Sequence, residues 1–153
     1  MPASAALLRF QKTITELLYS LSGVAEFAGE RGNIAFFSGD EQAPIPCVKC
    51  GFATDGAINA DGPVVRYTRL QVDFFGTDRL ATISGMQAVI DYVILHPPEV
   101  LEQNYISVYD VRDIVGIRIG LAAEPNVSGF YVSTCQFNVT WRDNGYLYDT
   151  VGT

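Results

Sequence analysis

The hydrophobic pattern of the chain changes its period at Gly76, and this change constrains the fold more than any other feature. Residues 64–75 are predicted to form a strand with one wet face, because apolar and polar side chains alternate in its second half. The clearest alternation is that of Leu70, Val72 and Phe74 with Arg69, Gln71 and Asp73. Beyond this glycine, apolar spacings of three and four residues predict a helix, which Thr77 caps and Pro97 and Pro98 stop, because proline lacks the N–H that a helix interior needs. Its apolar stripe consists of Leu80, Ile83, Met86, Ile90 and Val93.

The N-terminal part of the chain carries a second helical pattern, and strand patterns fill most of the remainder. Residues 4–24 are predicted to form a helix, because their apolar residues also follow spacings of three and four. These residues are Leu7, Phe10, Ile14, Leu17, Leu21 and Val24. Further strands are expected at residues 34–37, 44–53, 105–111, 116–123 and 129–142.

The order of these elements predicts the fold class. Since helices and strands are segregated and do not strictly alternate, we expect an α+β fold. Its mainly antiparallel sheet has about four to five strands, with two helices packed on one face. The predicted core contains Leu17, Leu21, Leu70, Val72, Ile83, Ile90, Phe137 and Val139. The length of 153 residues fits one domain, which we assign to residues 1–142, followed by a polar C-terminal tail over residues 143–153.

The charge and cysteine content exclude several classes of protein. A formal net charge of -7 disfavours binding to the phosphate backbone, so we expect no sequence-specific or other direct nucleic-acid recognition. No apolar stretch reaches the roughly 18 residues of a membrane-spanning helix. Arg9, Gln11 and Lys12 interrupt the apolar run that a signal peptide would need. Three cysteines, an odd number, argue against a disulfide framework and fit synthesis in a reducing cytoplasm.

Residues able to carry catalysis are scarce. His96 is the single histidine, and its position before two prolines favours a role at the C-terminal end of a helix. Cys47 and Cys50 form a CxxC pair, which alone is a weak sign of a zinc or redox site. We interpret them as structural cysteines; the alternatives are a metal site completed by Cys135 and His96, or a redox pair. No phosphate-binding, dinucleotide, hydrolase or metalloprotease motif is present, so we expect neither an enzyme nor a bound cofactor or metal.

Eight residues are candidates for an interface with other proteins. They are Arg66, Arg69, Asp73, Asp55, Asp61, Tyr146, Tyr148 and Asp149. The first three lie on one strand, where they form either a solvated face or, because arginine is enriched at interfaces, a contact with a partner. The next two belong to a Gly-rich loop over residues 54–63, which is typical of a solvated turn. The tail tyrosines are potential anchors, with a frayed end as the alternative. We expect the loop and the tail to be mobile in an isolated subunit and ordered on assembly.

Several of these features together resemble a known family. They are the sequence RLQVDFFG over residues 69–76, the helix over residues 77–93 with Ala81 and Ala88, the terminal strand FNVTW over residues 137–141, the N-terminal amphipathic helix, and a strand entered through Pro-Ile-Pro. This combination resembles the phage tail-terminator family, which includes the tail-completion and neck-terminator proteins of long-tailed phages. The chain departs from the family pattern at Phe75, where tyrosine is more usual, and by an extra passage over residues 30–42.

The resemblance implies a virion structural protein. Members of the family form a hexameric ring at the head-proximal end of the tail tube, end polymerisation of the tube and join the tail to the head connector. The implied partners are further copies of the chain, the tube protein and a connector or stopper protein, while DNA passes through the lumen. The implied location is the virion, in the tail or neck, after synthesis in the host bacterial cytoplasm. The alternatives are another head-tail joining or minor tail protein, a small thiol-based enzyme, or a ligand-binding module.

Overall fold

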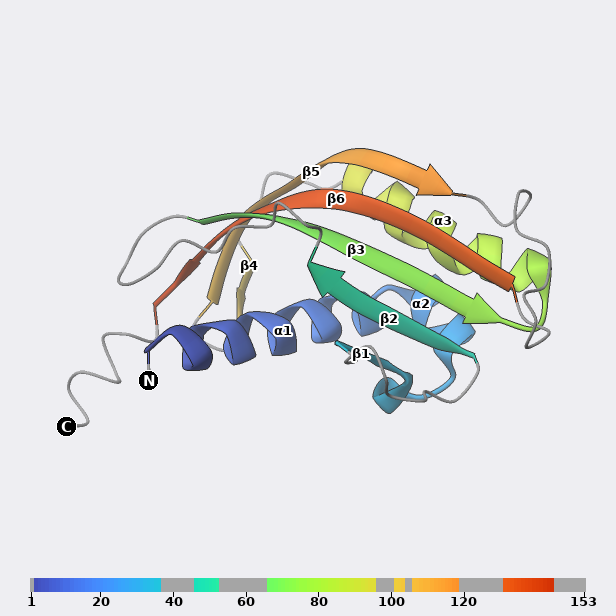
Figure 1. The fold of residues 1–153 in the computed structure, drawn as a ribbon, viewed down its shortest axis with the longest axis horizontal. Helices are drawn as coiled ribbons and strands as arrows, with labels where there is room; N and C mark the ends of the chain where they lie inside the picture. The colour runs from blue at the N-terminus through green and yellow to red at the C-terminus, as the bar shows by residue number, and fades with distance from the viewer. Residues whose placement is uncertain are drawn as a thin grey trace.

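One sheet of six strands organises the part of the chain that the computed structural model describes (Figure 1). The described residues are 2–36, 46–52, 66–95, 101–103, 106–118 and 131–144. The strands are β1 (Ile34–Phe36), β2 (Cys47–Phe52), β3 (Arg66–Gly76), β4 (Leu101–Gln103), β5 (Ile106–Arg118) and β6 (Tyr131–Asp143). The helical elements are α1 (Pro2–Ser20), α2 (Ser22–Ala28), the 3-10 turn η1 (Arg31–Asn33) and α3 (Arg79–Leu95). The α+β class is confirmed, although the sheet has more strands, and the fold more helices, than the sequence predicted.

The strand order of the sheet is β1-β2-β3-β6-β5-β4. β1 and β2 run parallel, whereas the other four neighbouring pairs are antiparallel, so the sheet is mixed but mainly antiparallel. β3 and β6 form its long centre, paired without interruption from Arg66 opposite Trp141 to Gly76 opposite Tyr131. Because side chains alternate between the two faces of a strand, this fixed register sorts every residue of β3 and β6 to one face or the other.

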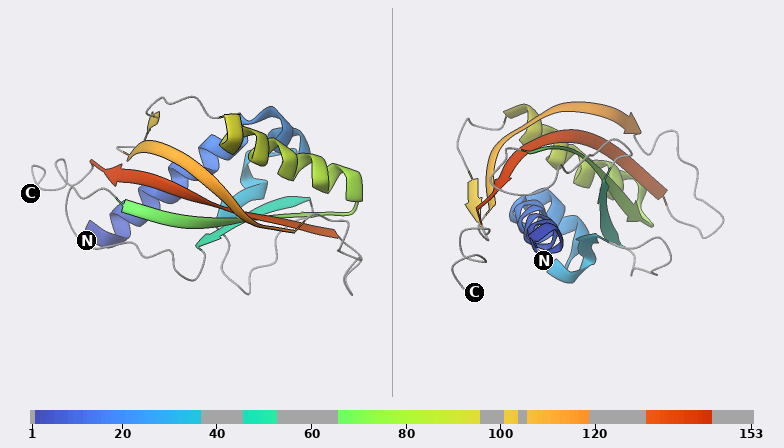
Figure 2. Two further views of the ribbon diagram at one scale, coloured as in Figure 1. Left: turned by 90° about the horizontal axis from the view of Figure 1, so that it is seen from above. Right: turned by 60° about the vertical axis from the view of Figure 1, so that its left-hand side comes forward.

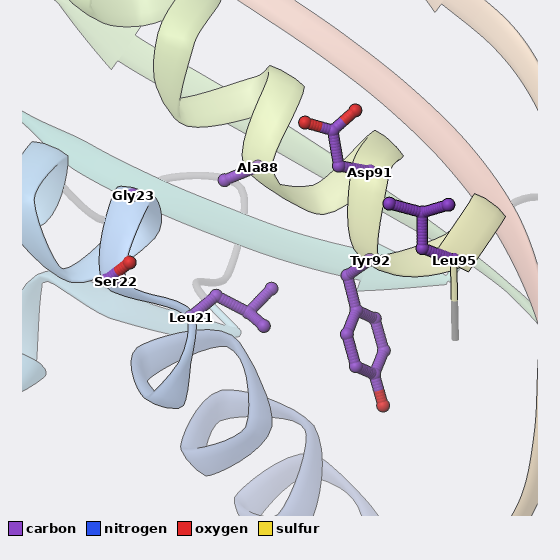
Figure 3. Close-up of a pocket in the computed structure, with 7 residues that line it drawn as sticks. All are labelled: Leu21, Ser22, Gly23, Ala88, Asp91, Tyr92 and Leu95. Atoms are coloured by element: carbon purple, nitrogen blue, oxygen red, sulfur yellow. The ribbon is translucent and has the colours of Figure 1, made fainter. Parts of the chain in front are cut away.

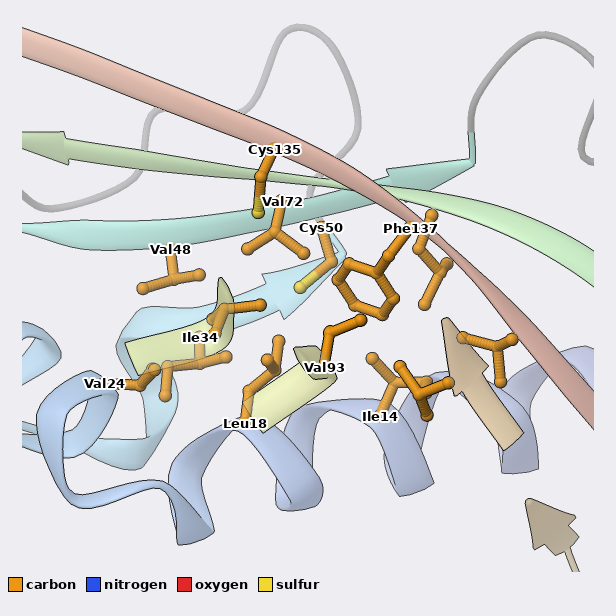
Figure 4. Close-up of a cluster of buried hydrophobic side chains, with 14 of the residues drawn as sticks. Ile14, Leu18, Val24, Ile34, Val48, Cys50, Val72, Val93, Cys135 and Phe137 are labelled. Atoms are coloured by element: carbon orange, nitrogen blue, oxygen red, sulfur yellow. The ribbon is translucent and has the colours of Figure 1, made fainter. Parts of the chain in front are cut away.

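All three α-helices pack against the same face of this sheet, which curls around them (Figure 2). From α1, Phe10 stacks on Trp141 of β6 with ring centroids 4.1 Å apart. From α2, Phe27 meets Phe74 of β3 edge-on at 5.5 Å. A side chain added at Gly85 of α3 would lie 3.1 Å from both of these phenylalanines, so α3 also packs closely on this face. The helices and the inner sheet face therefore share one hydrophobic core (Figure 4).

The predicted helix over residues 4–24 is in fact two helices, and this part of the prediction was wrong. Leu21 adopts an extended conformation between α1 and α2, with φ -80° and ψ 116°. The residues that follow it, Ser22 and Gly23, are weak helix formers, so interrupting the helix there costs little free energy. A Cβ atom at Gly23 would stand only 2.7 Å from the Cβ of Ala88, so this glycine permits close contact between α2 and α3.

The break also changes which side chains enter the core. Leu18 is buried although it lies outside the predicted stripe, whereas Leu17 and Leu21 are only half-buried. Ile83 is also half-buried. The remaining predicted core residues, Leu70, Val72, Ile90, Phe137 and Val139, are buried as expected.

The start of α3 differs from the prediction as well. Asp78, and not Thr77, caps the helix: the backbone N–H of Leu80 donates to Oδ1 of Asp78 at 3.0 Å. Leu80, a member of the predicted apolar stripe, is 73% exposed. The buried side of α3 is formed by Thr82, Gly85, Met86, Val89, Ile90 and Val93. The predicted stripe was therefore partly wrong, because apolar residues are spread around the whole helix and their spacing alone does not identify the packed side.

The C-terminal strands were predicted with the correct type but partly wrong limits. The strands expected at residues 105–111 and 116–123 form one strand, β5, up to Arg118. Shifts of register against β6 occur between Val108 and Asp110 and again on either side of Val115, and such irregularities explain the interrupted sequence pattern. The short strand β4 was not predicted. The strand expected at residues 129–142 is confirmed as β6.

Candidate protein interface

The outer face of β3 and β6 is lined by polar side chains that bind one another across the two strands. We call this the polar face; it comprises Arg69, Gln71, Asp73, Thr134, Gln136 and Asn138. Directly opposed residues in the register make each hydrogen bond. Nε of Arg69 donates to Oδ1 of Asn138 at 3.2 Å, and Nε2 of Gln136 donates to Oε1 of Gln71 at 2.9 Å. Oγ1 of Thr134 donates to Oδ1 of Asp73 at 2.7 Å.

A bond along β3 joins two of these pairs, Gln71–Gln136 and Asp73–Thr134. Nε2 of Gln71 donates to the carboxylate of Asp73, at 3.2 Å to Oδ1 and 3.3 Å to Oδ2. The polar face side chains are half-buried, and none of the described helices covers them. Cross-strand pairs of this kind each contribute about 0.2–1 kcal/mol to a sheet. The polar face is therefore a partly exposed surface whose side chains form hydrogen bonds with one another.

The structure places Arg69 and Asp73 on the same outward face of β3 but places Arg66 on the opposite face. Arg66 is 4% exposed on the inner face, with its guanidinium carbon 5.2 Å from the ring centroid of Trp141. Nε1 of Trp141 in turn donates to Oγ1 of Thr68 at 2.9 Å. Residues 66 and 69 are three apart on a strand, so they face opposite sides. That parity could have been read from the sequence, and it separates Arg66 from an outward-facing interface.

The other candidate residues named from the sequence lie outside the described part of the chain. They are Asp55, Asp61, Tyr146, Tyr148 and Asp149, and the same holds for His96. The loop over residues 54–63 and most of the tail over residues 143–153 also lie outside the described residues. Their expected roles stay predictions.

The CxxC pair occupies a strand, as expected, and strand geometry separates its two thiols. Cys50 lies opposite Val72, whose side chain is buried on the inner face, whereas Cys47 lies opposite Phe75 and belongs to the other face. Two thiols on opposite faces of a sheet cannot grip one ion or form a disulfide with each other. Among the described residues, no group of three histidine, cysteine or acidic side chains is placed to hold a metal ion.

The cysteine thiols are buried and held in the protonated form. Burial, and to a smaller extent the Asp73 carboxylate, raises the pKa of Cys135 from 9.0 to about 12. The same two causes raise the pKa of Cys50 further, with a small contribution from Cys135. Burial also raises the pKa of Cys47, partly offset by the Lys49 ammonium. A protonated, buried thiol is a poor nucleophile, so these cysteines lack the environment of a reactive cysteine.

A second outward surface, on α3, was not anticipated from the sequence. We call it the α3 ridge; it comprises Leu80, Ser84, Gln87, Asp91, Ile94 and Leu95. Its apolar members are strongly exposed: 73% for Leu80, 67% for Ile94 and 75% for Leu95. Polar residues lie between Leu80 and the Ile94–Leu95 pair, so the apolar surface is concentrated at the two ends of the ridge. Both ends are candidates for contact with a partner.

A hollow borders the C-terminal end of the α3 ridge (Figure 3). We call it the α2–α3 pocket; it is lined by Leu21, Ser22, Gly23, Ala88, Asp91, Tyr92 and Leu95, with a volume of about 290 Å³. It exists because the chain breaks at Leu21 and α2 approaches α3 closely through Gly23 and Ala88. The Ser22-Gly23 step is a partial signal for the break, but the spacing of apolar residues does not show a hollow.

Comparison with models of protein families and with curated proteins gives no match to this chain. Within the described residues, no helix is both long and apolar enough to cross a membrane.

Proposed function

We propose that this chain is a structural subunit of a phage virion, a ring-forming protein of the tail-terminator type that closes the head-proximal end of a tail tube. Assembly is the part of this proposal that the geometry supports, and the phage tail is the part that the sequence resemblance supports. The α+β fold, with its helices on one face of a mainly antiparallel sheet, agrees with what the resemblance implies.

The observation that carries the proposal is the α3 ridge. Three large apolar side chains, Leu80, Ile94 and Leu95, stand in water on a helix whose other side already fills the core. Transfer of such side chains out of water is favourable by about 25 cal/mol per Å² of apolar surface. A subunit of an assembly buries this surface against a neighbour.

The polar face supports a second contact in the same assembly. It runs along β3 and β6, is partly exposed, and carries Arg69 and Asp73 in hydrogen-bonded positions. A stiff polar surface suits a contact that must form and orient without strong adhesion, such as that with the tube protein or with a connector or stopper protein. Arg66, buried beneath Trp141, has no part in this contact.

The thiol-enzyme alternative finds little support in the arrangement of the cysteines. Cys47 and Cys50 face opposite sides of the sheet, and burial raises the pKa of all three thiols. Nucleophilic catalysis needs a thiolate with a base within hydrogen-bonding reach. The chain is therefore proposed to act through its surfaces, without catalytic residues.

The proposal is tested by the mass and shape of the purified full-length protein over a range of concentrations. Light scattering after size-exclusion chromatography is expected to give a closed oligomer several times heavier than the 16.7 kDa subunit. Negative-stain electron microscopy of the same fraction is expected to show rings with a central opening. A protein that remains monomeric at every concentration, or that forms only dimers, contradicts the proposed ring.

A further inference from the structure

The two charged residues of α3 oppose the electrostatics of the helix that carries them. Arg79 is the first residue of α3, and Asp91 lies one turn before its last residue. A helix carries partial positive charge at its N-terminus and partial negative charge at its C-terminus, so a cation at the start and an anion near the end both disfavour the helix. Both side chains are exposed. The helix dipole therefore does not account for their placement, although a hydrogen bond from Nε2 of Gln87 to Oδ1 of Asp91 supports Asp91 within the helix.

Each of these charges stands beside an apolar feature: one is an exposed side chain and the other is a hollow. Leu80 follows Arg79 and protrudes from the helix with 73% of its surface exposed. Asp91 lines the α2–α3 pocket together with Leu95 (Figure 3). The pocket volume of about 290 Å³ exceeds the roughly 150 Å³ of a cavity that accommodates benzene, so a leucine side chain fits.

We infer that Leu80 of one copy enters the α2–α3 pocket of a second copy, with Arg79 of the first copy facing Asp91 of the second. This inference rests on the proposed function, for which it names the contact between neighbouring subunits. The leucine and the pocket cannot meet within one chain, because the fifteen positions from Leu80 to Leu95 span roughly 22 Å of rigid helix. The occupant is thus another copy, identified by opposite charge and by matching apolar surfaces.

The contact leads to a ring because its two halves are different surfaces of the same chain. Each copy offers Leu80 to one neighbour and its pocket to another, which is a heterologous arrangement that closes into a ring when the rotation between copies permits. The acidic half is already positioned, since Nε2 of Gln87 donates to Oδ1 of Asp91 at 2.8 Å. Burying Leu80 against Leu95 removes the most exposed parts of the α3 ridge from water.

Charge reversal tests the electrostatic half of the contact. Arg79→Asp and Asp91→Arg are each expected to lose the oligomer, because each places like charges across the contact. Both changes favour the helix dipole, so neither is expected to lower the melting temperature, and a loss of mass cannot be attributed to misfolding. An equimolar mixture of the two variants is expected to recover the oligomer. Lys12→Asp, at an exposed site on α1, is the matched control and is expected to keep it. Unchanged oligomers in both single variants, or no recovery on mixing, would overturn the inference.

Cysteine crosslinking tests the apolar half and the direction of the contact. In a Leu80→Cys/Leu95→Cys double variant, oxidation is expected to give a ladder of covalent oligomers, because each chain is linked to two neighbours. The native cysteines are buried and do not compete in the folded protein. Each single variant, run as a control, is expected to give no ladder. A dimer band alone would indicate two antiparallel α3 helices in a symmetric pair and overturn the inference, as would the absence of crosslinks. The mass of the wild-type protein tests the ring itself, so a wild-type ring without the ladder refutes this contact and leaves the proposed function standing.

Discussion

The polar face and the α3 ridge both contact solvent, but they differ in the interactions of their side chains. On the polar face, opposed residues of β3 and β6 exchange hydrogen bonds, so the surface is complete without a partner. On the α3 ridge, Leu80, Ile94 and Leu95 contact water and gain only by being covered. The comparison teaches that accessibility alone does not mark an interface. The α3 ridge, whose apolar side chains are exposed to water, is the surface expected to hold copies of the chain together.

The two sides of α3 offer the largest effect with which to sharpen this comparison. Ile90 and Ile94 are the same residue type one turn apart, yet Ile90 is 7% exposed and Ile94 is 67% exposed. Ile90→Ala is expected to lower the free energy of unfolding by about 2–5 kcal/mol, because it leaves a cavity in the core. Ile94→Ala is expected to change it by less than about 0.5 kcal/mol in the monomer. Urea unfolding of both variants, at protein concentrations too low for the oligomer to form, measures these two free-energy changes. Equal losses would show that Ile94 is already covered within the monomer.

The inner side of the two central strands is expected to respond to alkali through Cys135. Its pKa rises from 9.0 to about 12 on folding, first through burial and then through the Asp73 carboxylate. Below pH 9 both states keep the proton and the thiol has no effect on stability. Between pH 9 and 12 the unfolded chain loses the proton while the folded chain retains it, so stability falls by up to about 1.4 kcal/mol per pH unit.

Other groups also titrate in this range, so the measurement is a difference between two proteins. Cys135→Ala is expected to show a shallower fall in unfolding free energy above pH 9 than the wild type. Parallel pH profiles of the two proteins would contradict the raised pKa.

The cap of α3 offers a smaller effect that distinguishes two adjacent residues. Asp78→Ala is expected to destabilise the protein by roughly 0.5–2 kcal/mol, because it removes the acceptor for the N–H of Leu80. Thr77→Ala, at the neighbouring exposed position, is expected to have little effect. Thermal unfolding of the two variants under one condition provides the test. A larger loss in Thr77→Ala would restore the cap that the sequence suggested.

The same contrast explains which features the sequence could predict. Strands with one wet face show their parity directly, so β3 and β6 and their buried residues, such as Val72 and Phe137, were predicted correctly. Parity also carries information about sites: it separates Arg66 from Arg69 and Cys47 from Cys50, although residue types alone had grouped them. On a strand, the two-residue period of the sequence pattern identifies the element and also shows which side chains share a face.

A helix with apolar residues on more than one side gives no comparable signal. In α3 the spacing of apolar residues is satisfied by more than one face, so Leu80 was placed on the predicted apolar stripe and the α3 ridge was missed. The break at Leu21 depends on how α2 docks against α3 through Gly23 and Ala88, which is a tertiary effect. The α2–α3 pocket results from the packing of α2 against α3. The spacing of apolar residues in the sequence could not predict it.

The smallest predicted effect tests whether the polar face is complete in itself. Gln71 and Gln136 lie opposite each other, with a hydrogen bond of 2.9 Å between their side chains. A double-mutant cycle with Gln71→Ala and Gln136→Ala is expected to give a coupling free energy of about 0.2–1 kcal/mol, and the oligomer is expected to persist in all three variants. The persistence follows because neither residue belongs to the contact inferred for the α3 ridge. If the coupling is absent and the oligomer is lost, the glutamines are held by a neighbouring subunit and not by each other. The polar face would then be the adhesive surface, and the comparison with the α3 ridge would be reversed.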